Sequence, residues 1–181
     1  MSGGRLFAVV GPSGAGKDTL IDGARAARPD IHFPRRVITR PETAGGEPFE
    51  GVSEAEFARR KAAGTFAIDW QAHGLCYGIP ASIDAALAAG RDVVFNGSRA
   101  ALPAARRRYP GLSVVLVTAP AGVLARRLAA RGREAEDEIA ARLARADYAV
   151  PDGAQVVENG GTVAAGVAAF LACLNAPAAP A

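Results

Sequence analysis

The stretch RLFAVVGPSGAGKDTL near the N-terminus joins an apolar run, a glycine-rich turn and the start of a helical pattern. The apolar run predicts a buried strand over residues 5–10, and Leu20, Ile21 and Ala24 recur at helical spacing over Lys17–Ala27. A glycine-rich turn between a strand and a helix directs backbone N–H groups inward, where they bind phosphate oxygens. The stretch therefore predicts an α/β fold that carries a nucleotide phosphate loop.

The turn fits the pattern Gly-x-x-x-x-Gly-Lys, in which the lysine reaches the outer phosphates of the nucleotide. The predicted phosphate-binding residues are Gly11, Pro12, Ser13, Gly14, Ala15, Gly16, Lys17, Asp18 and Thr19. The alternative is a glycine-rich turn with a purely structural role. The expected strand before the turn and the helix after it favour phosphate binding.

Asp18 stands where the pattern has Ser or Thr, whose hydroxyl is a ligand of the magnesium ion on the nucleotide. Hard cations accept carboxylate ligands readily, so Asp18 is a candidate Mg²⁺ ligand, directly or through water. In the alternative interpretation Asp18 only caps the helix, where its charge suits the dipole, and Thr19 supplies the hydroxyl. Thr19 lies about 100° around the helix from the usual position, which favours Asp18.

Strands alternate with helices over most of the chain. Two further buried strands are predicted over residues 91–97 and 112–119, and a last short strand over 155–159. Helices are predicted over residues 80–89, 100–108, 120–131, 135–148 and 162–174. This alternation predicts a parallel sheet with helices on both faces.

The length suits a single domain, which we expect over residues 1–175, followed by a disordered tail over 176–181. An insert over about 35–80 breaks the alternation with the strand-like pieces RRVITR and TFAIDW, a short helix in SEAEFARRKAAG and the turn-rich PETAGGEPFEG. Residues 126–147 predict an arginine-bearing lid hairpin. Alternatively, lid arginines such as Arg126, Arg127 and Arg145 are solvated helix surface.

Composition narrows the possible partners. The net charge is +3, and Lys17 and Lys61 are the only lysines, so nearly all basic residues are arginines. An arginine excess suits nucleic acid or a small polyphosphate, or it reflects the base composition of the genome. No aromatic platform for single strands accompanies the arginines, so no nucleic-acid partner is expected. The chain lacks an apolar run of about 18 residues, so no membrane partner is expected either.

Cysteine spacing and the N-terminal residues bear on the compartment in which we expect the protein. Cys76 and Cys173 lack metal-ligand or disulfide-framework spacing, and the N-terminus enters the glycine-rich turn before a signal segment can form. We expect a cytoplasmic protein with free thiols, either a monomer or a homodimer.

The order GPSGAGKDTL, RRVITRPETAGGE, GVSEAEF, GTFAIDWQAHGLCYGIP and RRLAARGRE resembles the guanylate kinase family over nearly the whole chain. The resemblance implies a P-loop NTPase fold with an ATP loop, an acceptor-binding insert and an arginine lid. The positions at which that family reads guanine differ here. They hold Phe49, Ile68 or its neighbour Asp69, Ile79, and Asn96 with Ser98.

Losing several partners for buried guanine donors costs about 1 to 3 kcal/mol each, so guanine recognition is not expected. The residues that could bind the phosphate of the acceptor are still present in this sequence. The predicted substrate-binding residues are Arg36, Arg40, Tyr77, Asn96 and Arg99. His73 is either a further substrate contact or a structural residue.

The Asp in the loop, ITR, WQAHGLCYG and VVFNGSRAALPAARRRYP together resemble the ribose 1,5-bisphosphate phosphokinases of bacterial phosphonate breakdown. The resemblance implies transfer of the ATP γ-phosphate to a phosphorylated ribose, giving 5-phosphoribosyl 1-diphosphate. Lys17 and the lid residues Arg131, Arg133 and Arg142 are the expected catalytic residues, with ATP and Mg²⁺ as cofactors. The alternatives are a guanylate kinase and a non-catalytic phosphopeptide-binding module, although the intact loop disfavours the module.

Overall fold

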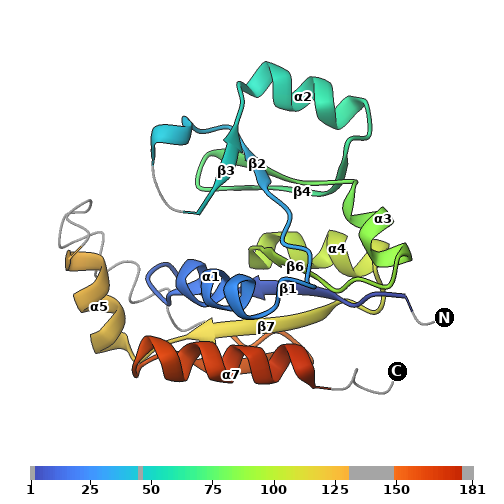
Figure 1. Ribbon diagram of the computed structural model, residues 1–181. Coiled ribbons are helices and arrows are strands. Elements are labelled where there is room, and N and C mark those ends of the chain that lie inside the picture. The colour runs from blue at the N-terminus through green and yellow to red at the C-terminus, as the bar shows by residue number, and fades with distance from the viewer. Residues whose placement is uncertain (1–2, 45–46, 131–148, 177–181) are drawn as a thin grey trace. The chain divides into compact units, whose positions relative to one another are not determined.

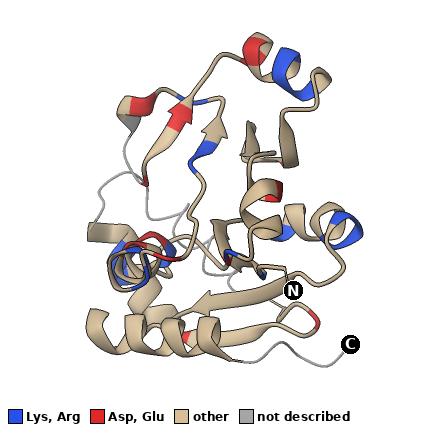
Figure 2. Cartoon of the chain, turned by 45° about the vertical axis from the view of Figure 1, so that its right-hand side comes forward, with Lys and Arg blue, Asp and Glu red and all other residues tan. Residues whose placement is uncertain are grey.

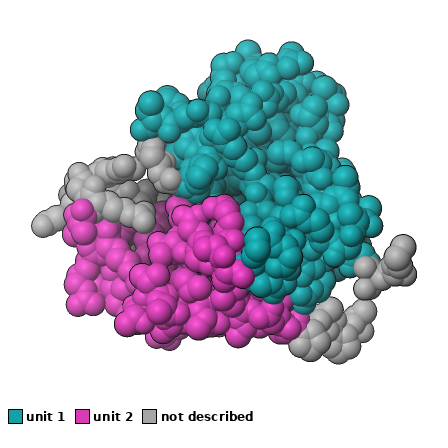
Figure 3. Space-filling view, viewed as in Figure 1, with its two compact units in different colours: residues 1–8, 28–113, 181 teal, residues 9–27, 114–180 magenta. Residues whose placement is uncertain are grey.

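The structure is a computed structural model that describes residues 3–44, 47–130 and 149–176 of the chain. The helix expected over 135–148, most of the expected lid and all but the first residue of the expected tail lie outside these ranges. The chain divides into two compact units (Figure 3). Unit 1 comprises residues 1–8, 28–113 and 181, and unit 2 comprises residues 9–27 and 114–180.

Four strands form one sheet in the order β6-β1-β7-β8. They are β1 (Leu6–Val10), β6 (Val93–Asn96), β7 (Ser113–Thr118) and β8 (Gln155–Glu158). β7 and β8 are parallel, from the pair Val115 and Gln155 to the pair Thr118 and Glu158. All five residues of β1 are buried, which explains why the strand reads as a continuous apolar run. All four strands were predicted from the sequence.

Unit 2 contains three described helices, which are α1 (Lys17–Ala27), α5 (Ala121–Ala130) and α7 (Val163–Asn175) (Figure 1). α1 packs against α7, and the close contact falls at Gly23. A Cβ atom at Gly23 would lie 2.5 Å from Cγ2 of Val167. The hydroxyl of Thr162 caps α7 by accepting a hydrogen bond from the backbone N–H of Ala165 at 3.2 Å.

Unit 1 contains a second sheet of order β3-β2-β5-β4. Its strands are β2 (Arg36–Ile38), β3 (Phe49–Gly51), β4 (Phe66–Ala72) and β5 (Leu75–Pro80). β2 and β3 run parallel, whereas β5 is antiparallel to both β2 and β4. The sequence predicted β2 and β4. It did not predict β3, which lies in a turn-rich segment, or β5, which contains Gly78 and ends at Pro80.

His73 and Gly74 form the two-residue turn between β4 and β5, with φ angles of 52° and 74°. Positive φ at both central residues is typical of a type I′ hairpin turn. His73 is exposed in this turn. This backbone conformation supports the structural interpretation of His73, because the residue forms part of the turn.

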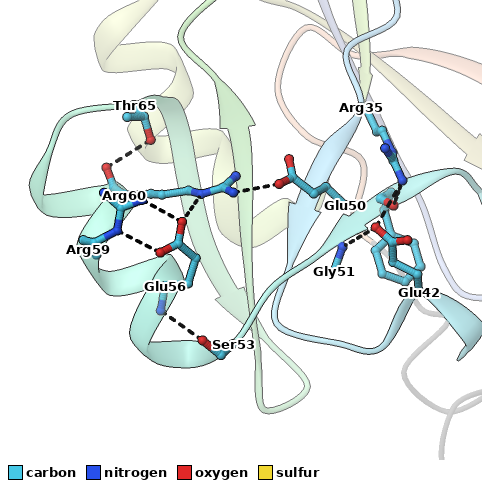
Figure 4. A network of polar contacts seen from close by, with 10 residues as sticks. Arg35, Glu42, Glu50, Gly51, Ser53, Glu56, Arg59, Arg60 and Thr65 are labelled. Carbon is cyan, nitrogen blue, oxygen red and sulfur yellow. Dashed lines mark hydrogen bonds and ion pairs between the residues drawn. The ribbon is translucent and has the colours of Figure 1, made fainter.

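The helix α2 (Glu54–Ala62) follows β3 and belongs to the same unit. Ser53 caps it by accepting a hydrogen bond from the N–H of Glu56 at 3.1 Å (Figure 4). Acidic residues occupy its first turn and basic residues its last turn, the order that suits the helix dipole (Figure 2). Arg60 extends from α2 to the carboxylate of Glu50 on β3 at 2.7 Å and so joins the helix to the sheet.

The remaining described elements are η1 (Glu42–Ala44), α3 (Ile83–Ala88), η2 (Arg99–Ala101) and α4 (Leu102–Arg108). Among the described residues, no helix has both the length and the apolar character needed to cross a membrane.

Candidate active site

The phosphate loop connects β1 to α1 and belongs to unit 2. Gly11, the first residue of the pattern, has a φ of 152°, and a Cβ atom there would lie 2.0 Å from the carbonyl oxygen of Val117 on β7. Only glycine allows the loop to leave β1 so close to the neighbouring strand. Gly14 and Gly16 have φ angles of 82° and 91°.

Lys17 opens α1, and its ammonium group lies over the loop. Its Nζ donates to the carbonyl oxygens of Gly11 at 2.8 Å and Pro12 at 3.2 Å. Asp18 and Thr19 follow in the first turn of α1, where Asp18 is partly buried and Thr19 is exposed. A lysine and a carboxylate at the start of the helix suit a nucleotide phosphate and its hard cation.

The loop has two supporting residues that the sequence did not single out for this role. Arg127 on α5 donates through Nη1 to the carbonyl oxygens of Gly14 and Ala15, both at 3.3 Å, and through Nη2 to the carbonyl oxygen of Asn159 at 2.8 Å. The side-chain amide of Asn159 donates to Ala15 at 2.8 Å. Arg127 is thus bound to the loop and is not solvated helix surface.

A polar cluster in unit 1 joins two of the predicted substrate-binding residues. Glu47 accepts hydrogen bonds from Nε of Arg36 and, at 3.1 Å, from Nδ2 of Asn96 at the end of β6. The side chains of Arg36 and Glu47 are only 13% and 10% exposed, and Asn96 is buried. The sequence did not predict a role for Glu47, although an acidic residue close to an expected arginine site was a usable signal.

Tyr77 on β5 lies beside this cluster. The guanidinium carbon of Arg36 is 5.4 Å from the centre of the Tyr77 ring, a cation–π distance. On the other neighbouring strand, Trp70 stacks on Tyr77 with ring centres 5.2 Å apart and planes 4° apart. The stacked pair fixes the plane of Tyr77, and Arg36 is held by both Tyr77 and Glu47.

Two more predicted substrate-binding residues, Arg40 and Arg99, also belong to unit 1. Arg40 follows β2, and its guanidinium carbon is 4.5 Å from the centre of the Phe49 ring. Arg99 is exposed at the start of η2, directly after Ser98, whose hydroxyl caps that short helix. Both arginines thus lie on segments next to elements that carry the polar cluster, Arg40 after β2 and Arg99 after β6.

The positions at which guanylate kinases read guanine are apolar or already paired. Phe49, Ile68 and Ile79 are buried, with 3%, 3% and 0% of their surface exposed. Asp69 forms an ion pair with Lys61 of α2. At the remaining such positions, Asn96 donates to Glu47 and the Ser98 hydroxyl accepts from the backbone N–H of Ala100.

The predicted lid residues Arg131, Arg133 and Arg142 lie outside the described residues. Burial raises the pKa of the Cys173 thiol on α7, which makes this cysteine a weak nucleophile. Both Cys76 and Cys173 are free cysteines.

The loop, the helix that it opens and the parallel strands define an α/β protein of the P-loop kinase class. The guanylate kinase of Anaplasma phagocytophilum has a similar fold, with a TM-score of 0.69 over 96% of this chain and 86% of its own, at 16% identity. The ribose 1,5-bisphosphate phosphokinase of Pseudomonas fluorescens is 51% identical over 181 residues, and 95% of each chain is covered. The chain belongs to the ribose 1,5-bisphosphate phosphokinase family.

Another relative is larger. The bifunctional ribose 1,5-bisphosphokinase-thymidine phosphorylase of Cupriavidus necator is 55% identical over 175 residues, which are 95% of this chain but 29% of that protein. No protein-family model matches the chain. The α/β P-loop kinase fold and the family predicted from the sequence are thus confirmed.

Proposed function

We propose that the protein transfers the γ-phosphate of ATP to the 1-phosphate of ribose 1,5-bisphosphate, giving 5-phosphoribosyl 1-diphosphate and ADP. An oxygen of the 1-phosphate forms a bond to the γ-phosphorus, and the bond from that phosphorus to the β,γ-bridging oxygen breaks. The observation that carries the proposal is the polar cluster of Arg36, Glu47 and Asn96 in unit 1. It offers Arg36 and Asn96 to an anion, while Phe49, Ile68 and Ile79 stand where a base would be read.

On the donor side, the loop glycines and Lys17 suit the β- and γ-phosphates of ATP. The positive φ of Gly14 and Gly16 and the position of Lys17 at the start of α1 support this assignment. Asp18 is our candidate for holding Mg²⁺, directly or through water, because its carboxylate follows the lysine in the first helical turn. When bound, the ion would neutralise charge on the phosphate oxygens.

On the acceptor side, a phosphate is already ionised near neutral pH, so no general base is required. Alignment and neutralisation of charge are then the main catalytic tasks. We assign Arg36, Arg40 and Arg99 to the acceptor phosphates, with Tyr77 and Asn96 as polar contacts. A carboxylate repels phosphate, so we assign Glu47 to holding Arg36 and Asn96 in place and to accepting hydrogen bonds from sugar hydroxyls.

The lid arginines complete the proposal. We assign Arg131, Arg133 and Arg142 to closing over the transferring group, on the basis of the family resemblance. Their positive charges would neutralise negative charge on the oxygens of the phosphoryl group during its transfer. Planar guanidinium groups also match the geometry of phosphate.

We further propose a cytoplasmic enzyme of phosphonate breakdown that works as a monomer or homodimer. The proposed use of ATP and the two free cysteines support the compartment. The resemblance to phosphokinases of phosphonate breakdown supports the pathway.

A two-acceptor assay tests the proposed function. The purified protein is given ATP and Mg²⁺ with ribose 1,5-bisphosphate or GMP, and the products are identified by ³¹P NMR. We expect a diphosphate signal from the sugar acceptor and negligible turnover of GMP. Preferential turnover of GMP would instead establish a guanylate kinase. The variant Lys17→Ala is the control for activity from contaminating kinases, since it should lose turnover of both acceptors.

A further inference from the structure

Asn159 is a buried polar residue whose side chain fits between two glycines. It is 5% exposed and follows β8 directly. A Cβ atom on Gly16 would lie 2.4 Å from its Nδ2, and a Cβ atom on Gly166 would lie 2.3 Å from its Oδ1. The loop and α7 therefore both leave room for this amide. A buried amide in such a slot, with its Nδ2 bonded to the loop, indicates a specific role.

The carbonyl oxygen of Ala15 accepts two hydrogen bonds from outside the loop, one from Asn159 at 2.8 Å and one from Arg127 at 3.3 Å. A carbonyl oxygen has two lone pairs, so both are used. Arg127 also donates to the carbonyl oxygen of Gly14 and to the backbone of Asn159 itself. Two side chains from α5 and the end of β8 thus hold two consecutive loop carbonyls.

The direction of these carbonyls determines the direction of a backbone donor. In a trans peptide the C=O and N–H point in opposite directions. The peptide that carries the Ala15 carbonyl also carries the N–H of Gly16. With the carbonyl fixed toward Asn159, the N–H of Gly16 is directed away from Asn159.

We propose that Asn159 and Arg127 are positioning residues for the nucleotide phosphates. They hold the Gly14 and Ala15 carbonyls outward, so that the N–H of Gly16 points at a phosphate oxygen before the nucleotide binds. Loop glycines adopt alternative peptide orientations readily, and a preset orientation lowers the cost of binding. The inference rests on the proposed ATP site but not on the identity of the acceptor.

The test is the affinity for ATP with Mg²⁺, measured by calorimetry without any acceptor. Asn159→Asp keeps the shape of the side chain but places a carboxylate oxygen against the Ala15 carbonyl. We expect its ATP affinity to fall about tenfold or more at pH 8. Protonation of the introduced carboxyl restores a donor, so the difference from the wild type should shrink as the pH is lowered. A purely structural role gives no reason for this pH-dependent recovery.

Arg127→Lys keeps the positive charge but loses the planar fork that serves three carbonyls, so its ATP affinity should also fall. Arg25→Ala is the matched control, because Arg25 is an arginine of the same unit whose ion partner Asp22 lies on its own helix. It should bind ATP as the wild type does. Circular dichroism shows which variants are folded.

Wild-type ATP affinity at every pH in folded Asn159→Asp and Arg127→Lys proteins would overturn the inference. If one variant fails to fold, the other still decides the matter. A wild-type protein that binds ATP but leaves ribose 1,5-bisphosphate unchanged would refute the proposed function alone, because the binding test needs no acceptor.

Discussion

The side-chain amide of Asn96 donates to Oε2 of Glu47 at 3.1 Å, although the two residues are 49 positions apart in the chain. The other carboxylate oxygen of Glu47 accepts from Arg36. One acidic side chain therefore sets the position of two residues that we assign to the acceptor. This relationship makes Glu47 the most informative residue to change on the acceptor side.

Glu47→Gln should lower kcat/KM for ribose 1,5-bisphosphate by about ten- to hundredfold. The two oxygens of Glu47 accept hydrogen bonds from Arg36 and Asn96, and the introduced NH₂ group is a donor that cannot accept from either of them. The KM for ATP should change little. Steady-state kinetics with each substrate varied in turn measures both effects. Glu54→Gln, at an exposed position of α2, is the control. Equal losses for ATP and for the acceptor would argue that Glu47 only supports the fold.

The magnesium assignment predicts a different pattern for Asp18. Asp18→Ala should raise the Mg²⁺ concentration required for half-maximal turnover far more than it raises the KM for ATP. Asp18→Ser, which restores the usual hydroxyl, should keep most of the activity. Titration of Mg²⁺ at fixed ATP gives the answer. An unchanged magnesium requirement in Asp18→Ala would leave Asp18 as a helix cap.

The buried strands and the loop were predictable because each depends on local sequence. β1 is an apolar run and β6 is apolar up to its last residue, Asn96, and both strands are buried along their whole length. The glycine pattern needs only its own residues. β3 and β5 were missed for a physical reason. β3 has three residues, β5 contains a glycine and a proline, and both are strands because β2 lies between them.

The same distinction holds for the candidate site. Arg36, Tyr77 and Asn96 were identified from motifs, and the structure brings them together in unit 1. The roles of Glu47, Asn159 and Arg127 were not identified, because the hydrogen bonds that define them join residues far apart in sequence. The bond from Asn159 to Ala15 spans 144 positions, a separation that no local pattern reveals. A polar residue directly after the strand β8 was the available signal, since ligands bind at that edge of parallel sheets.

The charge network of α2 predicts a pH effect (Figure 4). Hydrogen bonds from Arg59 and then Arg60 lower the pKa of Glu56 from its ordinary value of 4.5 to about 2. Because the pKa is lowered on folding, the stabilisation is present above pH 4.5 and is lost as the pH falls toward 2. Carboxyl ¹³C NMR should show Glu56 titrating near that low value. In Arg59→Ala the midpoint should rise, and an unchanged midpoint would contradict the assignment.

The hydroxyl of Tyr109 should make the stability of the protein depend on pH in the alkaline range. Burial, and then its hydrogen bond to Asp84 at 2.6 Å, raise the pKa of Tyr109 to about 12. A raised pKa means that the stabilisation is complete below pH 10 and is lost as the pH rises toward 12. The difference in absorbance at about 295 nm between the wild type and Tyr109→Phe isolates this ionisation. We expect Tyr109→Phe to cost about 1 kcal/mol near neutral pH, measured by urea unfolding.

Two glycine-to-alanine substitutions, one at Gly11 where the chain enters the phosphate loop and one at Gly122 in α5, should have opposite effects on stability. A Cβ atom at Gly11 would lie 2.0 Å from the carbonyl oxygen of Val117, whereas one at Gly122 in α5 would have no neighbour within 4 Å. Gly11→Ala should therefore destabilise the protein by about 2 kcal/mol and weaken ATP binding, because β7 or the loop must shift. Gly122→Ala should stabilise it by about 0.5 to 1 kcal/mol, because alanine loses less backbone entropy on folding. Urea unfolding and ATP calorimetry of both variants measure this contrast. If Gly11→Ala retained wild-type stability and ATP affinity, the close approach of the loop to β7 would not be what requires glycine there.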